Sequence, residues 1–393
     1  MKILAIRETN PFIQSNASSN RFLSLITGLV SNGNEVDLFF TYSYLNKREK
    51  KQFKPKGIFT NINYEYLLPF AFPIRLIRGI FNRLIPQKIY AKKIKRKIAN
   101  NKYDYIWIGF SPNLIKLGLY LFKYELSVKY FHEQSEYSWI GLDDSKLHNL
   151  YLNKFLPQLD VFAVMTNTLI NYYKKFIDSK TQILQLPMTV DFSRFDDNCG
   201  NSDLKKPYIA YCGIKNLKGD GVDILTKAFI KIMNEFPDYH LYIAGPLEPE
   251  KDYNYVKSII EANNASNRIT FIGHIHKNEI PKFLMNATIL ALARPQSKQA
   301  EGGFPTKLGE YLATGNPVCV TKVGEIANYL TDNESAFVSE PNSVDSFAKT
   351  LKRAITSPEA KIIGKRGQNI AYKYFNKDIQ SKELSDFLIN NLL

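Results

Sequence analysis

One pattern occurs twice in this chain and restricts its fold more than any other feature: an apolar strand, a loop, a helix and a second apolar strand. In the first copy the strands are KILAIR at 2–7 and EVDLFF at 35–40. In the second copy they are PYIAYCG at 207–213 and HLYIAG at 240–245. Strands that alternate with helices form parallel sheets with helices on both faces. The sequence therefore predicts an α/β protein with two doubly wound parallel sheets.

The length of the chain agrees with two domains. At 393 residues the chain is too long for one ordinary hydrophobic core. The run 185–207 is polar and rich in turn-forming residues, as expected of a connection. We expect an N-terminal domain at 1–190, a linker at 191–204 and a C-terminal domain at 205–377. Further strands are predicted at 103–110, 128–133 and 161–166 in the first domain, and at 268–273, 288–293 and 317–321 in the second.

The composition indicates a folded protein of a reducing compartment. Apolar residues make up 45% of the chain, which is enough for packed cores. The three cysteines, Cys199, Cys212 and Cys319, have unrelated spacings and predict no disulfide framework. Polar residues follow MKILAIR at once, so no secretory signal is predicted, and no apolar run reaches the roughly 18 residues of a membrane-spanning helix. We expect a cytoplasmic protein, either free or on the inner face of the plasma membrane.

Much of the net charge of +15 is concentrated in one stretch. Residues 69–102 contain ten basic residues and no acidic one, interleaved with large apolar side chains such as Phe70, Ile80 and Ile94. A basic amphipathic stretch suits an anionic membrane surface better than it suits the stacking of nucleic-acid bases. The alternatives are a coding bias toward Lys, Asn and Ile, and packing against the N-terminal sheet. We expect peripheral membrane contact through 69–102 and no nucleic-acid partner.

The segment EGGFPTKLGEYLATGNPVCVT, residues 301–321, predicts a site for a nucleoside diphosphate. Pro305 suits the first turn of a helix, residues 306–314 have the pattern of that helix, and Gly315 ends it. A helix that opens from a Gly/Pro loop presents unpaired backbone N–H groups and a partial positive charge. Glu310 lies about one turn further along, roughly 6 Å by helical rise, where a carboxylate can accept both ribose hydroxyls. Taken alone, Glu310 could equally be a solvated helix residue.

This segment resembles the C-terminal donor-binding signature of glycosyltransferase family 4, also called group 1. Members are retaining enzymes with two facing Rossmann-like domains, the GT-B fold. The second glutamate of the family's Glu-x7-Glu motif holds the ribose and corresponds to Glu310. The position of the motif's first glutamate is occupied by Gly302 in this chain. The neighbouring Glu301, displaced by one residue, is the candidate for its role, which in the family is contact with the sugar hydroxyls. The resemblance also implies that the terminal helix, about 378–393, returns to the N-terminal domain.

The resemblance extends to other parts of a donor site. Residues 212–229 are similar to the family's glycine loop and following lysine, here Gly213 and Lys218. Lysine is a suitable point charge for a diphosphate, although Lys218 alone would be taken for a surface lysine. Arg294 follows a strand, at the edge where open α/β sheets bind ligands.

One part of this site departs from the family's sequence pattern, and another part is assigned only because it matches the family. Where the family commonly has a loop arginine, this chain has Ile214-Lys215-Asn216, so Lys215 or Arg294 is the expected substitute. FIGHIH at 271–276, read as a strand, matches the place where the family cradles the nucleobase with backbone groups. The expected donor residues are Gly213, Lys215, Lys218, His274, Ile275, Arg294, Phe304, Thr306, Lys307, Leu308 and Glu310.

The sequence predicts a reaction without a metal. Metal-dependent transferases often place Asp-x-Asp after an apolar strand, and this chain contains no Asp-x-Asp. His274 and His276 share a face of the predicted strand, but no Cys or third His accompanies them. Cleavage of a sugar–phosphate bond leaves extra negative charge on the diphosphate, which a helix N-terminus, Lys218 and Arg294 can stabilise. We expect neither a metal nor another cofactor.

The N-terminal half is predicted to bind the acceptor. The family often has a histidine at the end of the strand that is predicted here at 128–133, and His132 is the match. It is suited to bond the sugar or to relay the acceptor proton, whereas a hydrogen-bonded strand-end histidine is the alternative. The loop 8–21 takes the place of a glycine-rich acceptor loop but contains no glycine. The expected acceptor residues are Ser18, Arg21, Glu133 and Glu136, and the expected catalytic residues are His132, Lys218, Arg294 and Glu301.

These features favour a retaining glycosyltransferase that moves a sugar from a nucleoside-diphosphate sugar to a saccharide or a lipid-linked saccharide. In bacteria the resemblance implies surface or capsular polysaccharide assembly. Two other classes stay open. A nucleic-acid-binding protein would use the 69–102 stretch and show steep salt dependence. A dinucleotide-dependent oxidoreductase would carry Gly-x-Gly-x-x-Gly after a first strand, and neither first strand is followed by it.

Overall fold

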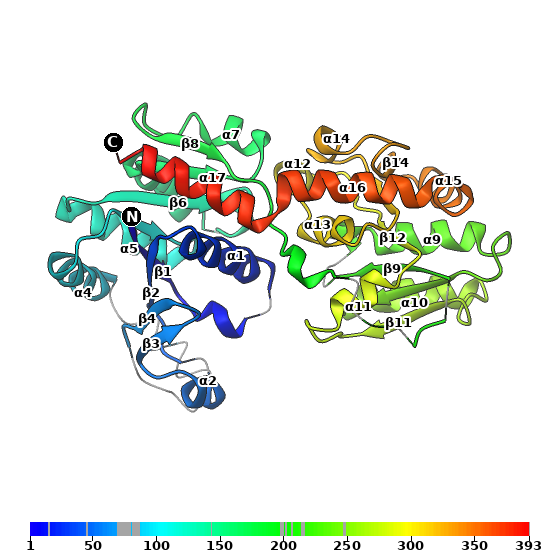
Figure 1. Ribbon diagram of the computed structural model, residues 1–393, viewed down its shortest axis with the longest axis horizontal. Coiled ribbons are helices and arrows are strands. Elements are labelled where there is room, and N and C mark those ends of the chain that lie inside the picture. Colours follow the sequence, from blue (N-terminus) through cyan, green and yellow to red (C-terminus); the bar gives the residue numbers. More distant parts are fainter. Residues whose placement is uncertain are drawn as a thin grey trace. The chain divides into compact units, whose positions relative to one another are not determined.

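The chain folds into two compact units, shown in Figure 1. This structure, a computed structural model, describes residues 1–14, 16–44, 46–68, 80, 87–142, 144–196, 200, 203–205, 207–213, 217–246 and 249–392. The first unit comprises Met1–Pro187 and Asp378–Leu393, and the second comprises Met188–Lys377. Residues 191–204, predicted as a linker, group with the second unit. Among the helices that can be described, none is both long and apolar enough to cross a membrane.

The first unit is built on a sheet that is parallel except at one edge. Over the described residues its strand order is β3-β4-β2-β1-β5-β6-β7-β8, and β3 alone runs antiparallel to its neighbour. The strands are β1 (Lys2–Arg7), β2 (Glu35–Phe40), β3 (Lys56–Phe59), β4 (Ile62–Tyr66), β5 (Tyr105–Ile108), β6 (Lys129–Gln134), β7 (Val161–Val164) and β8 (Gln182–Gln185). The helices are α1 (Ala17–Ser31), α2 (Lys47–Gln52), α4 (Gln87–Asn100), α5 (Pro112–Leu121), α6 (Ser145–Leu150) and α7 (Asn167–Tyr173).

The last helix of the chain, α17 (Lys377–Asn390), packs into the core of this first unit. Leu384 and Leu388 are fully buried in the same apolar cluster as Ile3 of β1. Two hydrogen bonds reinforce the packing: Asn34 Nδ2 donates to Ser385 Oγ at 2.8 Å, and Tyr105 Oη donates to the Leu388 carbonyl at 2.9 Å. The chain thus returns to its first sheet after completing the second unit, as the sequence resemblance implies.

The second unit contains a wholly parallel sheet in the order β11-β10-β9-β12-β13-β14, within the described residues. Its first strand therefore lies in the middle, and the chain fills the sheet outward on one side and then on the other. Such an order creates a switch point between the two central strands, here β9 and β12. The strands are β9 (Tyr208–Cys212), β10 (His240–Ala244), β11 (Ile269–Gly273), β12 (Ile289–Leu292), β13 (Val318–Thr321) and β14 (Phe337–Ser339).

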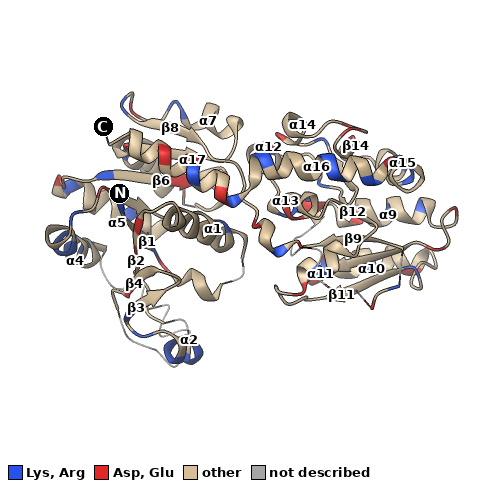
Figure 2. Cartoon of the chain, viewed as in Figure 1, with Lys and Arg blue, Asp and Glu red and all other residues tan. Residues whose placement is uncertain are grey.

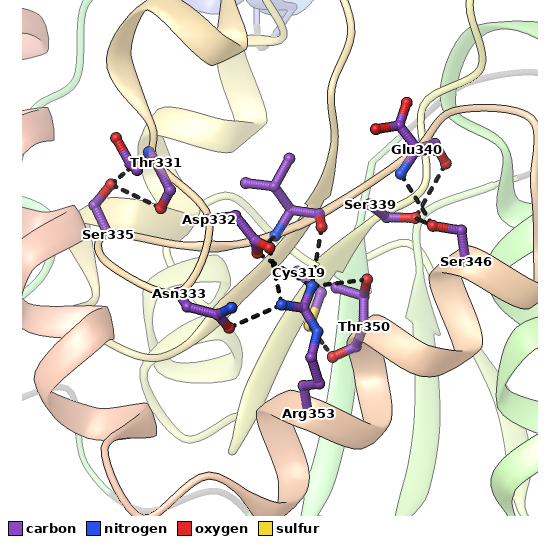
Figure 3. A network of polar contacts seen from close by, with 11 residues as sticks. Cys319, Thr331, Asp332, Asn333, Ser335, Ser339, Glu340, Ser346, Thr350 and Arg353 are labelled. Carbon is purple, nitrogen blue, oxygen red and sulfur yellow. Dashed lines mark hydrogen bonds and ion pairs between the residues drawn. The ribbon is translucent and has the colours of Figure 1, made fainter.

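Helices cover both faces of this sheet, and a polar network closes its β14 edge. Arg353 of α15 donates to both carboxylate oxygens of Asp332, at 2.9 and 3.1 Å (Figure 3). Arg353 Nη2 also donates to the Val338 carbonyl at 3.1 Å. This bidentate contact fixes the loop that leads into β14. The helices are α8 (Leu217–Asp220), α9 (Val222–Ile232), α10 (Glu250–Ala262), α11 (Ile280–Met285), α12 (Lys298–Gly302), α13 (Thr306–Ala313), α14 (Ile326–Tyr329), α15 (Val344–Thr356) and α16 (Ala360–Phe375).

The predicted α/β class with two doubly wound sheets is confirmed, and most differences concern element ends. The segment 271–276 is the main correction, because β11 ends at Gly273, whose φ of 76° lies in the left-handed region. His274 and His276 therefore lie in the following loop and do not share a strand face. Helix α1 begins at Ala17, within the segment 8–21 that is predicted as a loop, since Asn16 caps it by accepting from the Ser19 N–H at 2.8 Å.

Candidate active site

The carboxyl ends of β9 and β12 meet at the switch point of the second sheet. Gly213 follows β9 directly, and Arg294 follows β12 after one residue. Gly221, with a φ of 66°, packs so closely on the Ala293 carbonyl that a Cβ would collide with it. The short helix α8, which carries Lys218 and directly precedes Gly221, is therefore held against the end of β12. The predicted donor residues Gly213, Lys218 and Arg294 come from elements that meet at this one edge.

Gly213 makes room for Lys307 of α13. A Cβ at Gly213 would lie 2.5 Å from Lys307 Nζ and 2.8 Å from Tyr211 Oη. Lys307 Nζ forms an ion pair with Asp220 Oδ2 and lies 3.2 Å from Tyr211 Oη. The Asp220 side chain is 1% exposed and that of Lys307 is 13% exposed, so both charges are withdrawn from water. Asp220 thus compensates part of the positive charge that the sequence assigns to the donor site.

The N-terminus of α13 opens as the sequence predicts. The helix begins at Thr306 after Pro305, and no side chain caps it within the described residues. Phe304 is buried, with its ring centroid 5.1 Å from that of Phe375, and Leu308 is fully buried. These two side chains anchor the helix in the core. The groups of this segment that remain suited to a diphosphate are the backbone N–H groups of the first turn.

Tyr311 ties the same helix to the end of β9. Its hydroxyl accepts a hydrogen bond from the Cys212 N–H at 2.7 Å and donates to the Cys212 carbonyl at 3.2 Å. Burial, followed by the charge of Glu310, raises the pKa of the Cys212 thiol to about 12. The thiol therefore stays protonated at neutral pH and is a poor nucleophile.

Glu310 lies on the accessible side of α13 and forms an ion pair with Arg194. Arg194 Nη1 donates to Glu310 Oε1 at 2.6 Å, and Arg194 Nη2 lies 3.3 Å from the Lys277 carbonyl. The two side chains are 33% and 28% exposed. Arg194 ends the short 3-10 turn Phe192–Arg194, at the start of the second unit. It therefore links the predicted ribose carboxylate to the loop after β11.

The remaining predicted donor residues differ in their surroundings. Arg294 is 8% exposed, and its carbonyl accepts from Thr321 Oγ1 at 2.5 Å. Glu301 of α12 is exposed, and its Oε1 accepts from Gln296 Nε2 at 2.8 Å. His274 is exposed and Ile275 half-buried in the loop after β11. Lys215 lies outside the described residues. No group of three or more His, Cys, Asp or Glu side chains within the described residues is arranged to hold a metal ion.

The predicted acceptor residues of the first unit gather at the carboxyl ends of β1 and β6. Arg21 Nε donates to Glu133 Oε1 at 2.8 Å, and its Nη1 and Nη2 donate to the Pro187 and Leu186 carbonyls. Arg21 is 5% exposed, so its guanidinium is committed to these internal contacts and ties α1 to β6 and to the segment after β8. Ser18 is exposed, and its Oγ lies 3.5 Å from Arg7 Nη2. The Glu136 carbonyl accepts from Gln134 Nε2 at 2.9 Å and from Tyr173 Oη at 3.0 Å.

His132 does not lie at a strand end, contrary to the sequence prediction. Strand β6 continues to Gln134, and the His132 ring is fully buried. Its Nδ1 is 2.6 Å from the Ile108 carbonyl and its Nε2 is 3.1 Å from Tyr151 Oη. Burial lowers the pKa of His132 to about 4, so the ring is neutral at physiological pH. A catalytic role for His132 stays a prediction, and direct contact with a sugar would require the surrounding side chains to move.

Sequence reasoning missed three charged residues of these sites. Arg194 falls within the predicted linker 191–204, and Asp220 belongs to no motif that the sequence singles out; their pairing partners, Glu310 and Lys307, lie far away in sequence. Arg7 ends β1 with its guanidinium 4.5 Å from the centre of the Phe22 ring. Burial lowers the pKa of Arg7, against the opposing charges of Glu133 and Glu8. The available signal for Arg7 was its place at the carboxyl end of a predicted central strand.

Comparison with known proteins agrees with this arrangement. Residues 194–370 match the family of glycosyl transferases group 1. An uncharacterized glycosyltransferase of Haemophilus influenzae is 26% identical over 140 residues, which span 35% of this chain and 37% of that relative. Sucrose-phosphate synthase from Thermosynechococcus elongatus has a similar structure, with a TM-score of 0.73, 15% identity and coverage of 99% of this chain and 98% of that one.

A second solved structure, HepE of Anabaena in complex with UDP, matches with a TM-score of 0.72 and 13% identity, over 99% of this chain and 100% of that one. At these identities the solved structures establish a common fold. The sequence match, in turn, covers the unit that contains α13 and the switch point. The second unit therefore matches the family of glycosyl transferases group 1 over residues 194–370, and the two-sheet architecture of the chain is the GT-B fold.

Proposed function

We propose that this protein transfers a sugar from a nucleoside-diphosphate sugar to a saccharide or lipid-linked saccharide acceptor. The observation that carries the proposal is the pairing of an uncapped helix N-terminus at Thr306 with a half-exposed carboxylate at Glu310, one turn along the same helix. This spacing, about 6 Å, suits a diphosphate at the helix start and ribose hydroxyls at the carboxylate. The switch point of the second sheet is the usual place for such a ligand.

The similar solved structures support the donor class. HepE of Anabaena has been solved with UDP and with UDP-glucose. Its fold matches both units of this chain, so a nucleotide sugar is the substrate class to test first. In our proposal the loop after β11, with His274 and Ile275, cradles the nucleobase through its backbone. Lys215 lies outside the described residues, and we keep it as an additional cation for the diphosphate.

We further propose that transfer proceeds with retention and without a metal. The bond between the anomeric carbon and the diphosphate oxygen breaks, and the leaving diphosphate takes the electron pair. Lys218, Arg294 and the N-terminal N–H groups of α13 stabilise the added negative charge. The acceptor oxygen bonds to the anomeric carbon, and its proton passes to the oxygen of the leaving diphosphate. Glu301 is assigned to the sugar hydroxyls, since it is exposed at the end of α12.

The acceptor side of the proposal rests on the first unit. Arg7 and Ser18 lie together at the end of β1 and the start of α1, beside the Arg21–Glu133 pair. We assign acceptor binding to this edge, with His132 holding the Ile108 carbonyl and Tyr151 in place beneath it. A positioning role fits a buried, neutral imidazole better than proton transfer to solvent-accessible substrate.

We also propose a peripheral position on the cytoplasmic membrane, in surface or capsular polysaccharide assembly. Much of the predicted contact, 69–79 and 81–86, lies outside the described residues. The described helix α4 buries Tyr90, Ala91 and Ile94 and exposes Lys88, Ile89, Lys92, Lys93, Lys95 and Arg96. Its apolar face is thus used for packing, while its basic face is available for anionic lipid headgroups.

Calorimetric titration with UDP, GDP and ADP, and with their sugar conjugates, tests the central proposal. We expect one nucleoside diphosphate to bind, and its sugar conjugate to be consumed when a saccharide acceptor is supplied. NMR of the product anomer then distinguishes retention from inversion. If no nucleotide in the panel binds the folded protein, the assignment of Thr306 and Glu310 to a nucleotide site is wrong.

A further inference from the structure

A second basic surface surrounds α2 and β3 of the first unit, separate from the 69–102 stretch. From Asn46 to Asn61 every lysine and arginine is exposed. None of these side chains forms an ion pair within the described part of the chain. The only acidic residue in the segment, Glu49, is 1% exposed and accepts from Tyr66 Oη at 2.6 Å. The surface therefore presents cations alone, namely Lys47, Arg48, Lys50, Lys51, Lys54 and Lys56.

Large apolar side chains are exposed within the same segment. Ile58 of β3 is 71% exposed, and its neighbour Phe59 is 37% exposed. β3 is the edge strand of its sheet, and Thr60 and Asn61, with φ of 48° and 62°, form the tight turn into β4. A water-exposed isoleucine at the tip of an edge hairpin is costly to leave in solvent. Figure 2 shows the cations of α2 beside this hairpin.

The α2–β3 surface is connected by ring packing and hydrogen bonds to the loop assigned to the acceptor. The Phe59 ring lies 4.5 Å from that of Phe12, which belongs to the 3-10 turn Pro11–Ile13 in that loop. Asn10 Nδ2 donates to Tyr66 Oη at 2.8 Å, and this hydroxyl donates in turn to Glu49 of α2. The buried chain Asn10–Tyr66–Glu49 thus fixes the acceptor loop relative to the basic helix. Whatever binds α2 and β3 lies next to the acceptor loop.

We infer that the α2–β3 surface docks on an anionic lipid bilayer and so brings the acceptor loop to a membrane-embedded acceptor. Exposed cations meet the headgroups, while Ile58 enters the interfacial region. A nucleic acid would satisfy the cations but would leave Ile58 in water, because isoleucine cannot stack on bases. This inference rests on the proposed function only for the identity of the acceptor. The lipid contact itself can be tested without it.

The experiment compares full-length variants in vesicle co-sedimentation. One variant replaces Lys47, Arg48, Lys50 and Lys51 by Gln, and a second carries Ile58→Ser. The matched control replaces four exposed cations of α16 in the second unit, Lys361, Lys365, Arg366 and Lys373, by Gln. The vesicles are phosphatidylcholine with or without phosphatidylglycerol. All variants are first compared with the parent by thermal melting and by calorimetric titration with the nucleotide that the parent binds.

We expect the parent to sediment with phosphatidylglycerol vesicles in a salt-sensitive manner. The α2 variant should lose roughly 100-fold or more in vesicle partitioning, because each basic residue at an anionic surface contributes about a fivefold factor. Ile58→Ser should weaken the part of vesicle binding that remains at high salt, because apolar insertion is not screened by ions. The α16 control should partition like the parent.

Three results would overturn the inference. The first is an α16 control that loses as much as the α2 variant, which would indicate a response to net charge alone. The second is a parent that does not bind anionic vesicles, and the third is a parent that binds oligonucleotides in preference to them. Failure of nucleotide binding in the parent would instead count against the proposed function, and it would leave the vesicle result to stand by itself.

Discussion

Arg194 and Glu310 form an ion pair with 2.6 Å between Nη1 and Oε1, although 116 residues separate them in sequence. If Glu310 holds the ribose, Glu310→Ala should weaken nucleotide binding by about 1.5–3 kcal/mol, the range for a hydrogen bond to a charged group. Transfer should be lost as well. Calorimetry with the nucleoside diphosphate measures the first effect, and unchanged affinity would remove Glu310 from the nucleotide site.

Arg194→Gln tests whether the arginine acts through that carboxylate. The pair is partly exposed, so the ion pair itself contributes about 0–1 kcal/mol to stability. Its effect should appear in binding, where a correctly oriented carboxylate is needed. We expect a loss of affinity for the ribonucleotide and no further loss when Arg194→Gln is added to Glu310→Ala. Affinity for the 2′,3′-dideoxy analogue should be unaffected by Arg194→Gln. Additive losses in the double variant would show that Arg194 contacts the nucleotide independently.

Asp220 and Lys307 form a buried ion pair, and removing one partner leaves an uncompensated charge in the core. Asp220→Ala should therefore destabilise the protein by about 3–5 kcal/mol. The double variant Asp220→Ala with Lys307→Met should recover much of this loss, because no buried charge remains. Denaturant unfolding of the three proteins measures both effects. If the single and double variants were equally destabilised, the loss would come from altered side-chain packing and not from an unpaired buried charge.

The parts of the fold that the sequence predicts are those with local signals. The strands at 2–7, 35–40 and 207–213 are short apolar runs bounded by polar loops, and each lies within one residue of its predicted bounds. The helix that carries Glu310 is bounded by Pro305 and Gly315, both of which act through their own backbone dihedral angles. A single short window of sequence contains all this information.

The parts that the sequence does not predict depend on tertiary contacts. Strand β11 ends at Gly273 because its backbone turns there, which the apolar pattern of 271–276 conceals. His132 is buried because Tyr151, Phe155 and Phe162 surround its ring, and these side chains come from other elements. Asp220 and Arg194 join these sites through Lys307 and Glu310, partners that are distant in sequence and near only in the folded chain.

Lys218 offers a test of the leaving-group assignment. The negative charge on the diphosphate grows as the sugar–phosphate bond breaks, so a cation there should matter more in the transition state than in the ground state. We expect Lys218→Ala to lower kcat more than it raises the Kd of the nucleotide sugar. Steady-state kinetics and calorimetry together separate the two. A loss confined to donor affinity would make Lys218 a binding residue only.

The proposed reaction should not need a divalent ion. The helix N-terminus, Lys218 and Arg294 are assigned the compensation of the leaving diphosphate, so activity should survive EDTA. The assay is transfer by protein dialysed against EDTA, with and without added magnesium or manganese. If transfer activity were lost completely in EDTA and restored by magnesium or manganese, the metal-free mechanism would be wrong.

His132 predicts a specific dependence of stability on pH. Its pKa falls from an ordinary 6.5 to about 4 in the folded protein because of burial, so between these values the unfolded chain binds more protons. The stabilising contribution is complete above pH 6.5 and is lost as the pH falls toward 4. The difference corresponds to roughly 3 kcal/mol. Denaturant unfolding measures the change of unfolding free energy with pH between 4 and 6.5. The parent should show this dependence and His132→Gln should lack it. The control His276→Gln, at an exposed position, should behave like the parent. If the parent and His132→Gln share the same slope, His132 is not the buried neutral imidazole on which its positioning role depends.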